Sequence, residues 1–238
     1  MEPQIITNPE GLVRISLEAH VSAEYLVLQD GTGASARACD TEYAVSLAEG
    51  AALKMVFLSL DGPSLHNKLR VSLLGRDAAC DLAGLCLADG SQQMTYDILL
   101  THQVPQCRST QLFKNIVGGS AVTRFDGLIK VVPDAQQTEA YQANHNLLAS
   151  DTAKAYTRPQ LEIYADDVKC SHGATIGRLN PDELFYLRSR GIPQAEARLL
   201  QQMAFCQEVL DKISSGDWRE KMQQRVEEKL RDAGSSPA

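Results

Sequence analysis

A thiol and an imidazole lie two residues apart in the segment 161–175, where Cys170 and His172 follow the adjacent carboxylates Asp166 and Asp167. Alternate residues of an extended strand point to the same side, so Cys170 and His172 are expected on one face, with Cα atoms about 6.6 Å apart. Sulfur and imidazole ligands suit zinc, iron or an iron–sulfur precursor better than magnesium or calcium. The pattern therefore indicates a site for a soft or borderline metal.

The same spacing also fits an ordinary hydrophobic core. Val168 shares the parity of Cys170 and His172, and free cysteine is among the residue types that proteins bury most often. On spacing alone, three inward-facing core residues are the more common arrangement.

The elements that must position this pair are short strands, which dominate the chain up to about residue 178. Strand-like apolar runs occupy residues 12–17, 25–28, 53–60, 71–74 and 128–132. Asp–Gly pairs and other turn formers separate them, and helical periodicity is weak. The sequence therefore predicts a mainly β fold.

An internal repeat narrows this prediction. A shift of 32 residues superposes Ala121 on Ala153 and Val131 on Ile163, and a fainter copy occupies residues 77–87. Strands that recur at a fixed period without intervening helices favour a parallel β-helix, in which each coil buries its face on the next. A β-sandwich, which also separates short strands by turns, is the alternative.

The pattern changes after Gly177, which divides the chain into a β-helix core, residues 1–178, and a C-terminal helical domain, residues 179–238. Asn180 predicts an N-cap for a helix that starts at Pro181 and ends at Gly191, the position after a helix that glycine suits best. Leu184, Phe185 and Leu187 come early and close to the β body, so the sequence predicts that they dock on it.

Pro193 opens a longer amphipathic helix, and Asp217 begins a third, highly charged one. The second helix is the better candidate for binding another protein. Its predicted apolar stripe consists of Ala197, Leu200, Ala204 or Met203, Val209 and Ile213.

Composition excludes several function classes. The net charge of −7 disfavours nucleic-acid backbones and anionic membranes as partners, and no segment approaches the roughly 20 apolar residues of a membrane span. The start of the chain lacks the features of a secretion signal. Six cysteines are scattered without a CxxC pair, so free thiols in the reducing cytoplasm are expected.

Motifs of catalytic machinery are also missing. The sequence contains no GxxxxGK[ST] phosphate loop, no GxSxG elbow and no HExxH helix. His102 and Cys107 flank four residues, but nothing fixes their mutual orientation as a nucleophile pair. They are expected to be a loop histidine and a core cysteine.

From about residue 51 to residue 229 the sequence resembles the SufD branch of the SufB/SufD family, whose members are scaffold subunits of the SUF system for iron–sulfur cluster assembly. The resemblance implies a right-handed parallel β-helix followed by a small C-terminal α-helical domain, with no catalytic activity of its own. SufD-like members usually carry a further N-terminal helical region, so this chain is expected to be either a naturally shortened member or a trimmed form. The stretches that carry the resemblance are residues 109–114, 125–129, 136–148, 158–175 and 184–192.

The resemblance also implies partners and site residues. The β-helix would pair with a SufB-like paralogue, and the helical domain would engage a SufC-like ATPase. The family's functional histidine falls on His172, with Cys170 beside it. No cofactor would be bound permanently, and iron or a nascent iron–sulfur cluster would be shared with SufB. An unpaired β-helix edge would allow the isolated chain to form a homodimer. The residues expected to bind a partner are Leu184, Phe185, Tyr186, Arg190, Gly191 and Ile192.

Two other function classes remain open on the residues alone. A polysaccharide-active β-helix would need paired carboxylates, but Asp166 and Asp167 are adjacent and point oppositely in a strand. A structural solenoid that only associates with itself would need no metal chemistry.

Overall fold

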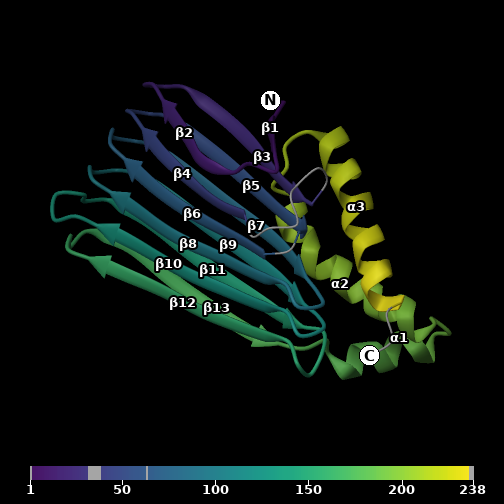
Figure 1. Ribbon diagram of the computed structural model, residues 1–238. Coiled ribbons are helices and arrows are strands. Elements are labelled where there is room, and N and C mark those ends of the chain that lie inside the picture. Colours follow the sequence, from purple (N-terminus) through teal and green to yellow (C-terminus); the bar gives the residue numbers. More distant parts are fainter. Residues whose placement is uncertain (1, 32–38, 63, 236–238) are drawn as a thin grey trace.

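The computed structural model describes residues 2–31, 39–62 and 64–235. Within these residues thirteen strands are followed by three helices (Figure 1). The strands are β1 (Gln4–Thr7), β2 (Gly11–Leu17), β3 (Ser22–Asp30), β4 (Cys39–Leu47), β5 (Ala52–Asp61), β6 (Ser64–Leu73), β7 (Ala79–Ala88), β8 (Gln93–His102), β9 (Arg108–Val117), β10 (Val122–Val131), β11 (Thr138–Leu148), β12 (Lys154–Ile163) and β13 (Val168–Gly177). The helices are α1 (Pro181–Ser189), α2 (Gln194–Leu210) and α3 (Gly216–Ser235).

Consecutive strands alternate between two parallel sheets. One sheet has the order β1-β3-β5-β7-β9-β11-β13 and the other β12-β10-β8-β6-β4-β2. Each strand therefore pairs with strands two positions away in the chain, so the chain coils and adds one strand to each sheet per turn. This arrangement confirms the predicted parallel β-helix and excludes the sandwich alternative, whose sheets are antiparallel.

The predicted repeat is confirmed for one pair of turns. Val131 of β10 lies opposite Ile163 of β12, 32 residues further along. Other turns are shorter, since Phe57 lies opposite Gly84, 27 residues on. The fainter copy at residues 77–87 falls largely in β7, which belongs to the other sheet. The prediction that residues 77–87 form a third copy of the repeated strand is therefore wrong.

The interior of the coil is filled by the inward-facing half of each strand. An aromatic stack runs through it, with ring centroids 5.2 Å apart for Tyr43 and Phe57, 4.9 Å for Tyr96 and Phe113, and 5.2 Å for Phe113 and Phe125. A Cβ atom at Gly84 would lie 2.4 Å from Cδ1 of Phe113. Glycine is therefore required there, because the phenyl ring occupies the space of a side chain.

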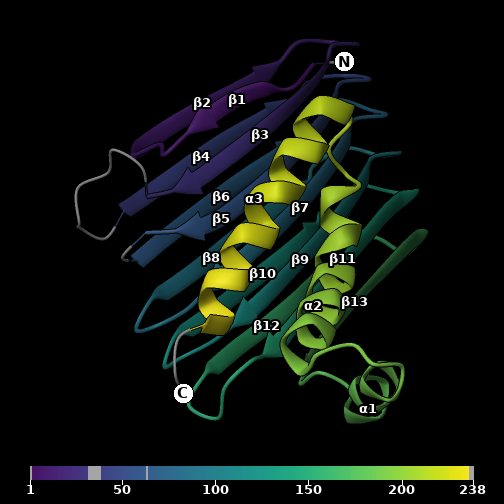
Figure 2. The same cartoon turned by 90° about the vertical axis from the view of Figure 1, so that its right-hand side faces the viewer.

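A second core lies between the helices and the outer face of the sheet that contains β3, β5, β7 and β9. Helices α2 and α3 run across this face (Figure 2), and they bury a shared apolar cluster with it. Ion pairs join the two layers, including Lys114 with Glu208 at 2.5 Å and Lys212 with Asp81 at 3.0 Å. The cluster contains Leu26, Leu58, Leu85 and Ile116 from the strands, Leu199, Cys206, Val209, Met222 and Val226 from the helices, and Ile213 from the connection between α2 and α3.

Helix α1 forms where predicted but does not dock. The Asn180 side chain accepts a hydrogen bond from the Asp182 amide at 2.9 Å, and Gly191 follows the helix with a φ of +85°. No residue of α1 is buried, however, and the Phe185 side chain is 71% exposed. The predicted docking of this helix through Phe185 is therefore wrong. Leu184 and Leu187 are half-buried.

Helix α2 is the docked helix, although the sequence favoured α1 for docking on the β body. Ala197 and Val209 are fully buried, as the predicted stripe requires, but Leu200 is 45% exposed and Leu199 is buried in its place. Ile213 is also buried, but it lies beyond the end of the helix at Leu210 and is not part of a helical stripe. The longer helix can cover more of the leucine-rich outer face of the sheet, so its burial is favoured over that of α1.

His102 ends β8 and is fully buried, which corrects the expectation of a loop histidine. Its Nε2 atom lies 2.9 Å from the Ser109 hydroxyl. Cys107 is buried as predicted, and its thiol donates a hydrogen bond to the Gly75 carbonyl at 3.2 Å. Burial lowers the pKa of His102 to about 4, so the imidazole stays neutral where an exposed histidine would be protonated.

This buried histidine makes stability depend on pH. Below the ordinary histidine pKa of about 6.5 the unfolded chain binds a proton that the folded chain excludes until about pH 4. The free energy of unfolding should therefore fall by about 2 kcal/mol between pH 7 and pH 5 because of this group alone. Urea unfolding at both pH values should show that loss in the wild type and a smaller one in His102→Gln. Equal losses in the two proteins would contradict the assignment.

Candidate functional site at the open end of the solenoid

The last turn of the solenoid leaves its inward face uncovered. Strands β12 and β13 end their sheets, each with a pairing partner on one side only among the residues described. Ile163 lies opposite the fully buried Val131, and Ile176 lies opposite the buried Asn146. Because no further turn follows, Ile163 and Ile176 are nevertheless 39% and 50% exposed. At the open end, side chains that face the interior of the coil are therefore exposed to solvent.

Cys170 and His172 both belong to this uncovered face. In the register of β11 and β13, Cys170 lies opposite Ala140 and His172 opposite Gln142. Ala140 and Gln142 are buried inside the coil, and residues in register on parallel strands point the same way. The thiol and the imidazole therefore share a face, as their spacing predicts.

The two side chains differ in burial. Cys170 is half-buried and packs against the interior core, whereas His172 is exposed. The core interpretation of the pattern thus fits Cys170 but not His172. Burial raises the pKa of the Cys170 thiol, and a hydrogen bond with the Ala140 backbone opposes that shift only in part. Cys170 is therefore a thiol at neutral pH and needs a bound metal to become a thiolate ligand.

These two groups do not make a complete metal site. Within the described parts of the chain, no three His, Cys, Asp or Glu side chains are grouped so that they could hold a metal ion. Asp166 and Asp167 are exposed in the bend before β13, where the Asp167 amide donates to Oε1 of Gln136 at 2.8 Å. A soft metal usually takes four ligands, so any such ion would need further ligands from another molecule.

A cluster of buried amides lies beneath the site and was missed in the sequence. Gln142, Asn144 and Asn146 occupy alternate, inward positions of β11. Nε2 of Gln142 donates to Oε1 of Gln111 at 2.9 Å, and Nδ2 of Asn115 donates to Oδ1 of Asn146 at 2.7 Å. The alternation of amide residues in the segment 142–146 could have predicted that these side chains share one face of a strand. Only the strand register shows that this face lies next to His172.

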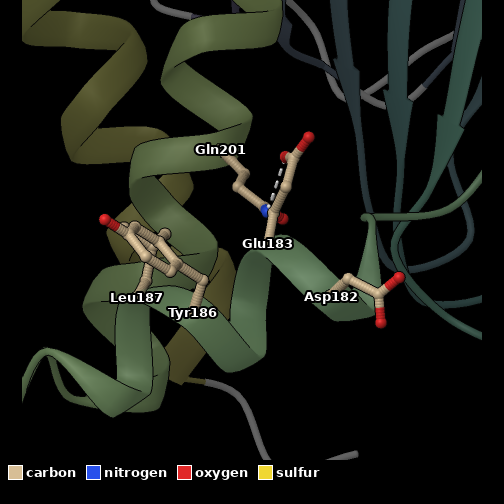
Figure 3. Close-up of a pocket in the computed structure, with 5 residues that line it drawn as sticks. All are labelled: Asp182, Glu183, Tyr186, Leu187 and Gln201. Carbon is tan, nitrogen blue, oxygen red and sulfur yellow. Dashed lines mark hydrogen bonds between the residues drawn. The ribbon is translucent and has the colours of Figure 1, made fainter.

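The second predicted surface, on α1, is exposed. A shallow hollow of about 400 Å³ lies between α1 and α2 (Figure 3). Nε2 of Gln201 donates to Oε2 of Glu183 across it at 3.0 Å. Tyr186 lines the hollow, and the Arg190 guanidinium lies 5.2 Å from the Tyr186 ring centroid. Gly191 is exposed and Ile192 is half-buried. Helix α1 thus offers apolar, aromatic and basic groups to solvent.

None of the helices in the described residues is long and apolar enough to cross a membrane.

Known proteins are similar to this chain in sequence. The family model described as SUF system FeS cluster assembly, SufBD core domain, matches residues 8–205. The chain is 36% identical over 184 residues to iron-sulfur cluster assembly protein SufD of Escherichia coli, which covers 77% of this chain and 44% of that protein. It is 32% identical over 192 residues to an iron-sulfur cluster assembly SufBD family protein of Mycobacterium tuberculosis, which covers 77% and 48%.

A plant relative extends the comparison. Protein ABCI7, chloroplastic, of Arabidopsis thaliana is 36% identical over 178 residues, or 73% of this chain and 37% of that protein. The chain therefore spans less than half the length of these relatives. The match at residues 8–205 includes strands β2 to β13, the open end of the solenoid and α1, and it confirms the resemblance inferred from the sequence. The chain belongs to the SufBD family of the SUF system for iron–sulfur cluster assembly.

Proposed function

We propose that this chain is a SufD-like scaffold subunit, which pairs with a SufB-like paralogue, carries a SufC-like ATPase and is not itself an enzyme. The observation that carries the proposal is the SufBD core match at residues 8–205, because it spans both the open end with His172 and the exposed helix α1. ATP hydrolysis would belong to the partner, in keeping with the missing phosphate loop in this sequence.

Pairing with the paralogue would take place at the open end. Strands β12 and β13 each have an edge there that pairs with no other described strand, and such edges bind further strands readily. Tyr156, Tyr164, Ile163 and Ile176 add exposed apolar surface to this end. A SufB-like solenoid would continue both sheets and cover these side chains. In its absence a second copy of this chain could take the same place and form a homodimer.

The paired end would hold iron or a nascent iron–sulfur cluster transiently, as cargo rather than as a resident cofactor. His172 would supply one ligand, and Cys170 a second once it has lost its proton. The paralogue would supply the rest, because mixed cysteine and histidine shells hold iron–sulfur clusters. Support for this division comes from the lack of a third ligand near the pair in the described residues.

The ATPase would bind α1, whose exposed residues include Phe185, Tyr186 and Arg190. Leu184 and Ile192, which are half-buried, would form the base of that surface, and Gly191 would shape its end. We also propose the cytoplasm as the place of work, since all six cysteines are free thiols.

Co-expression with SufB-like and SufC-like candidates, followed by anaerobic purification, tests the proposal. We expect a three-component complex that retains iron and acid-labile sulfide after reconstitution. If this chain purifies alone and stays colourless with both candidates present, a self-associating structural solenoid becomes the better description.

The Phe185→Asp variant tests the ATPase surface. A charge on this exposed ring position should reduce capture of the ATPase at least tenfold, the change expected when an aromatic anchor is lost. Pull-down titration measures the effect. Leu12→Asp is the matched control, because Leu12 is a similarly exposed apolar residue on β2. Equal capture by both variants would exclude Phe185 from the interface.

A further inference from the structure

Gln142 is buried inside the solenoid, and one of the two polar atoms of its side-chain amide forms no hydrogen bond with the described residues. Its side chain is 3% exposed, yet its Oε1 atom has no hydrogen-bond partner among the described residues. A buried acceptor without a donor lowers the stability of the folded chain. Such a group calls for a functional or structural explanation.

The hydrogen bond of the Gln142 Nε2 atom determines the direction in which its Oε1 atom points. Strand β11 lies between β9 and β13 in the sheet. Nε2 of Gln142 donates to Gln111 on β9 at 2.9 Å, so the carbonyl oxygen at the opposite side of the amide faces β13. The residue of β13 in register with Gln142 is His172, and neighbouring strands are about 4.8 Å apart.

The opposite sheet keeps the amide in this position. A Cβ atom at Gly127 of β10 would lie 2.5 Å from Nε2 of Gln142. The amide therefore fills the space above Gly127, and the glutamine is held between Gly127 and Gln111. His172, in contrast, is exposed and has room to turn its ring towards the carbonyl.

We propose that Gln142 is a positioning residue for His172, whose ring N–H donates a hydrogen bond to the Gln142 carbonyl oxygen. That bond selects one neutral tautomer and directs the lone pair of the other ring nitrogen outward, towards the partner at the open end. Histidines that bind metals are commonly oriented in this way by a carbonyl or carboxylate. The inference rests on the proposed ligand role of His172.

The tautomer of His172 tests the hydrogen bond in the isolated chain, without any metal. Long-range ¹H–¹⁵N NMR at pH 8 should show a single tautomer in the wild type and a mixture in Gln142→Met. Gln142→Glu, which keeps an acceptor oxygen, should restore the single tautomer. Asn115→Leu is the matched control, because it removes another buried amide from the interior but does not face His172.

Iron binding by the complex with the SufB-like paralogue gives the second measurement. Fe²⁺ affinity should fall about 10- to 100-fold in Gln142→Met, the usual loss for a residue that orients a metal ligand, and stay unchanged in Asn115→Leu. If Gln142→Met matches Asn115→Leu in both tautomer and affinity while His172→Ala loses iron, the positioning role is wrong and the ligand role stands. If His172→Ala keeps its iron, the proposed function fails first.

Discussion

Replacing His172 with alanine is expected to abolish retention of iron and sulfide by the reconstituted complex while the complex still assembles. The imidazole is exposed at the open end and fills no core space, so its loss should not prevent the chain from folding. Within the residues that the structure describes, Cys170 is the other candidate ligand beside it and no third one joins the pair, so removal of the imidazole leaves at most a single ligand from this part of the chain.

Anaerobic iron and sulfide analysis of the purified complex measures this effect, and size-exclusion chromatography reports assembly. His66→Ala is the control, because His66 lies on β6, far along the sheet from β12, and pairs with Asp40 at 3.1 Å. Wild-type iron and sulfide in the His172 variant would mean that the ligand role is wrong. A complex that no longer assembles would assign His172 to the interface instead.

Phe113→Ala should lower the free energy of unfolding by about 3–5 kcal/mol, the usual cost of removing a buried phenyl ring. Phe113 is fully buried between Tyr96 and Phe125 in the aromatic stack. The hydrogen bonds of β9 to β7 and β11 hold the backbone around the space in place, so a cavity should remain. Urea unfolding followed by circular dichroism measures the loss, and Leu128→Ala, on the outer face of β10, is the control.

The neighbouring glycine makes this prediction sharper. Gly84→Ala should destabilise the wild type, because its new Cβ atom would lie 2.4 Å from the Phe113 ring. In the Phe113→Ala background the same Cβ atom enters a cavity, so the second substitution should cost much less. The two effects should therefore not add. Additive losses in the double variant would show that Phe113 and Gly84 are not in the predicted contact.

Several features of the fold could be predicted from local sequence patterns. The period of two along β13 placed Cys170 and His172 on one face, and Asn180 and Gly191 marked the ends of α1. The 32-residue repeat matched the real register of β10 and β12. Each of these features depends on the conformation of a few consecutive residues or on one direct pairing between turns.

Docking of the helices could not be predicted in the same way. The sequence favoured α1 as the docked helix and α2 as the free one, and the structure reverses the two. Amphipathicity shows that a helix needs an apolar partner, but it does not identify that partner. Helix α2 packs on β7 and β9, whose apolar residues come from much earlier in the chain.

The sequence by itself determined that a thiol and an imidazole share one strand face, that the strands stack as coils and that helices follow them, because backbone period, caps and repeats are local. Only the tertiary structure decided that the coil ends at β13, so that Cys170 is half-covered and His172 exposed. It alone also placed Gln142 opposite His172. Exposure and register depend on which turns lie next to each other, and those contacts join residues about 30 positions apart.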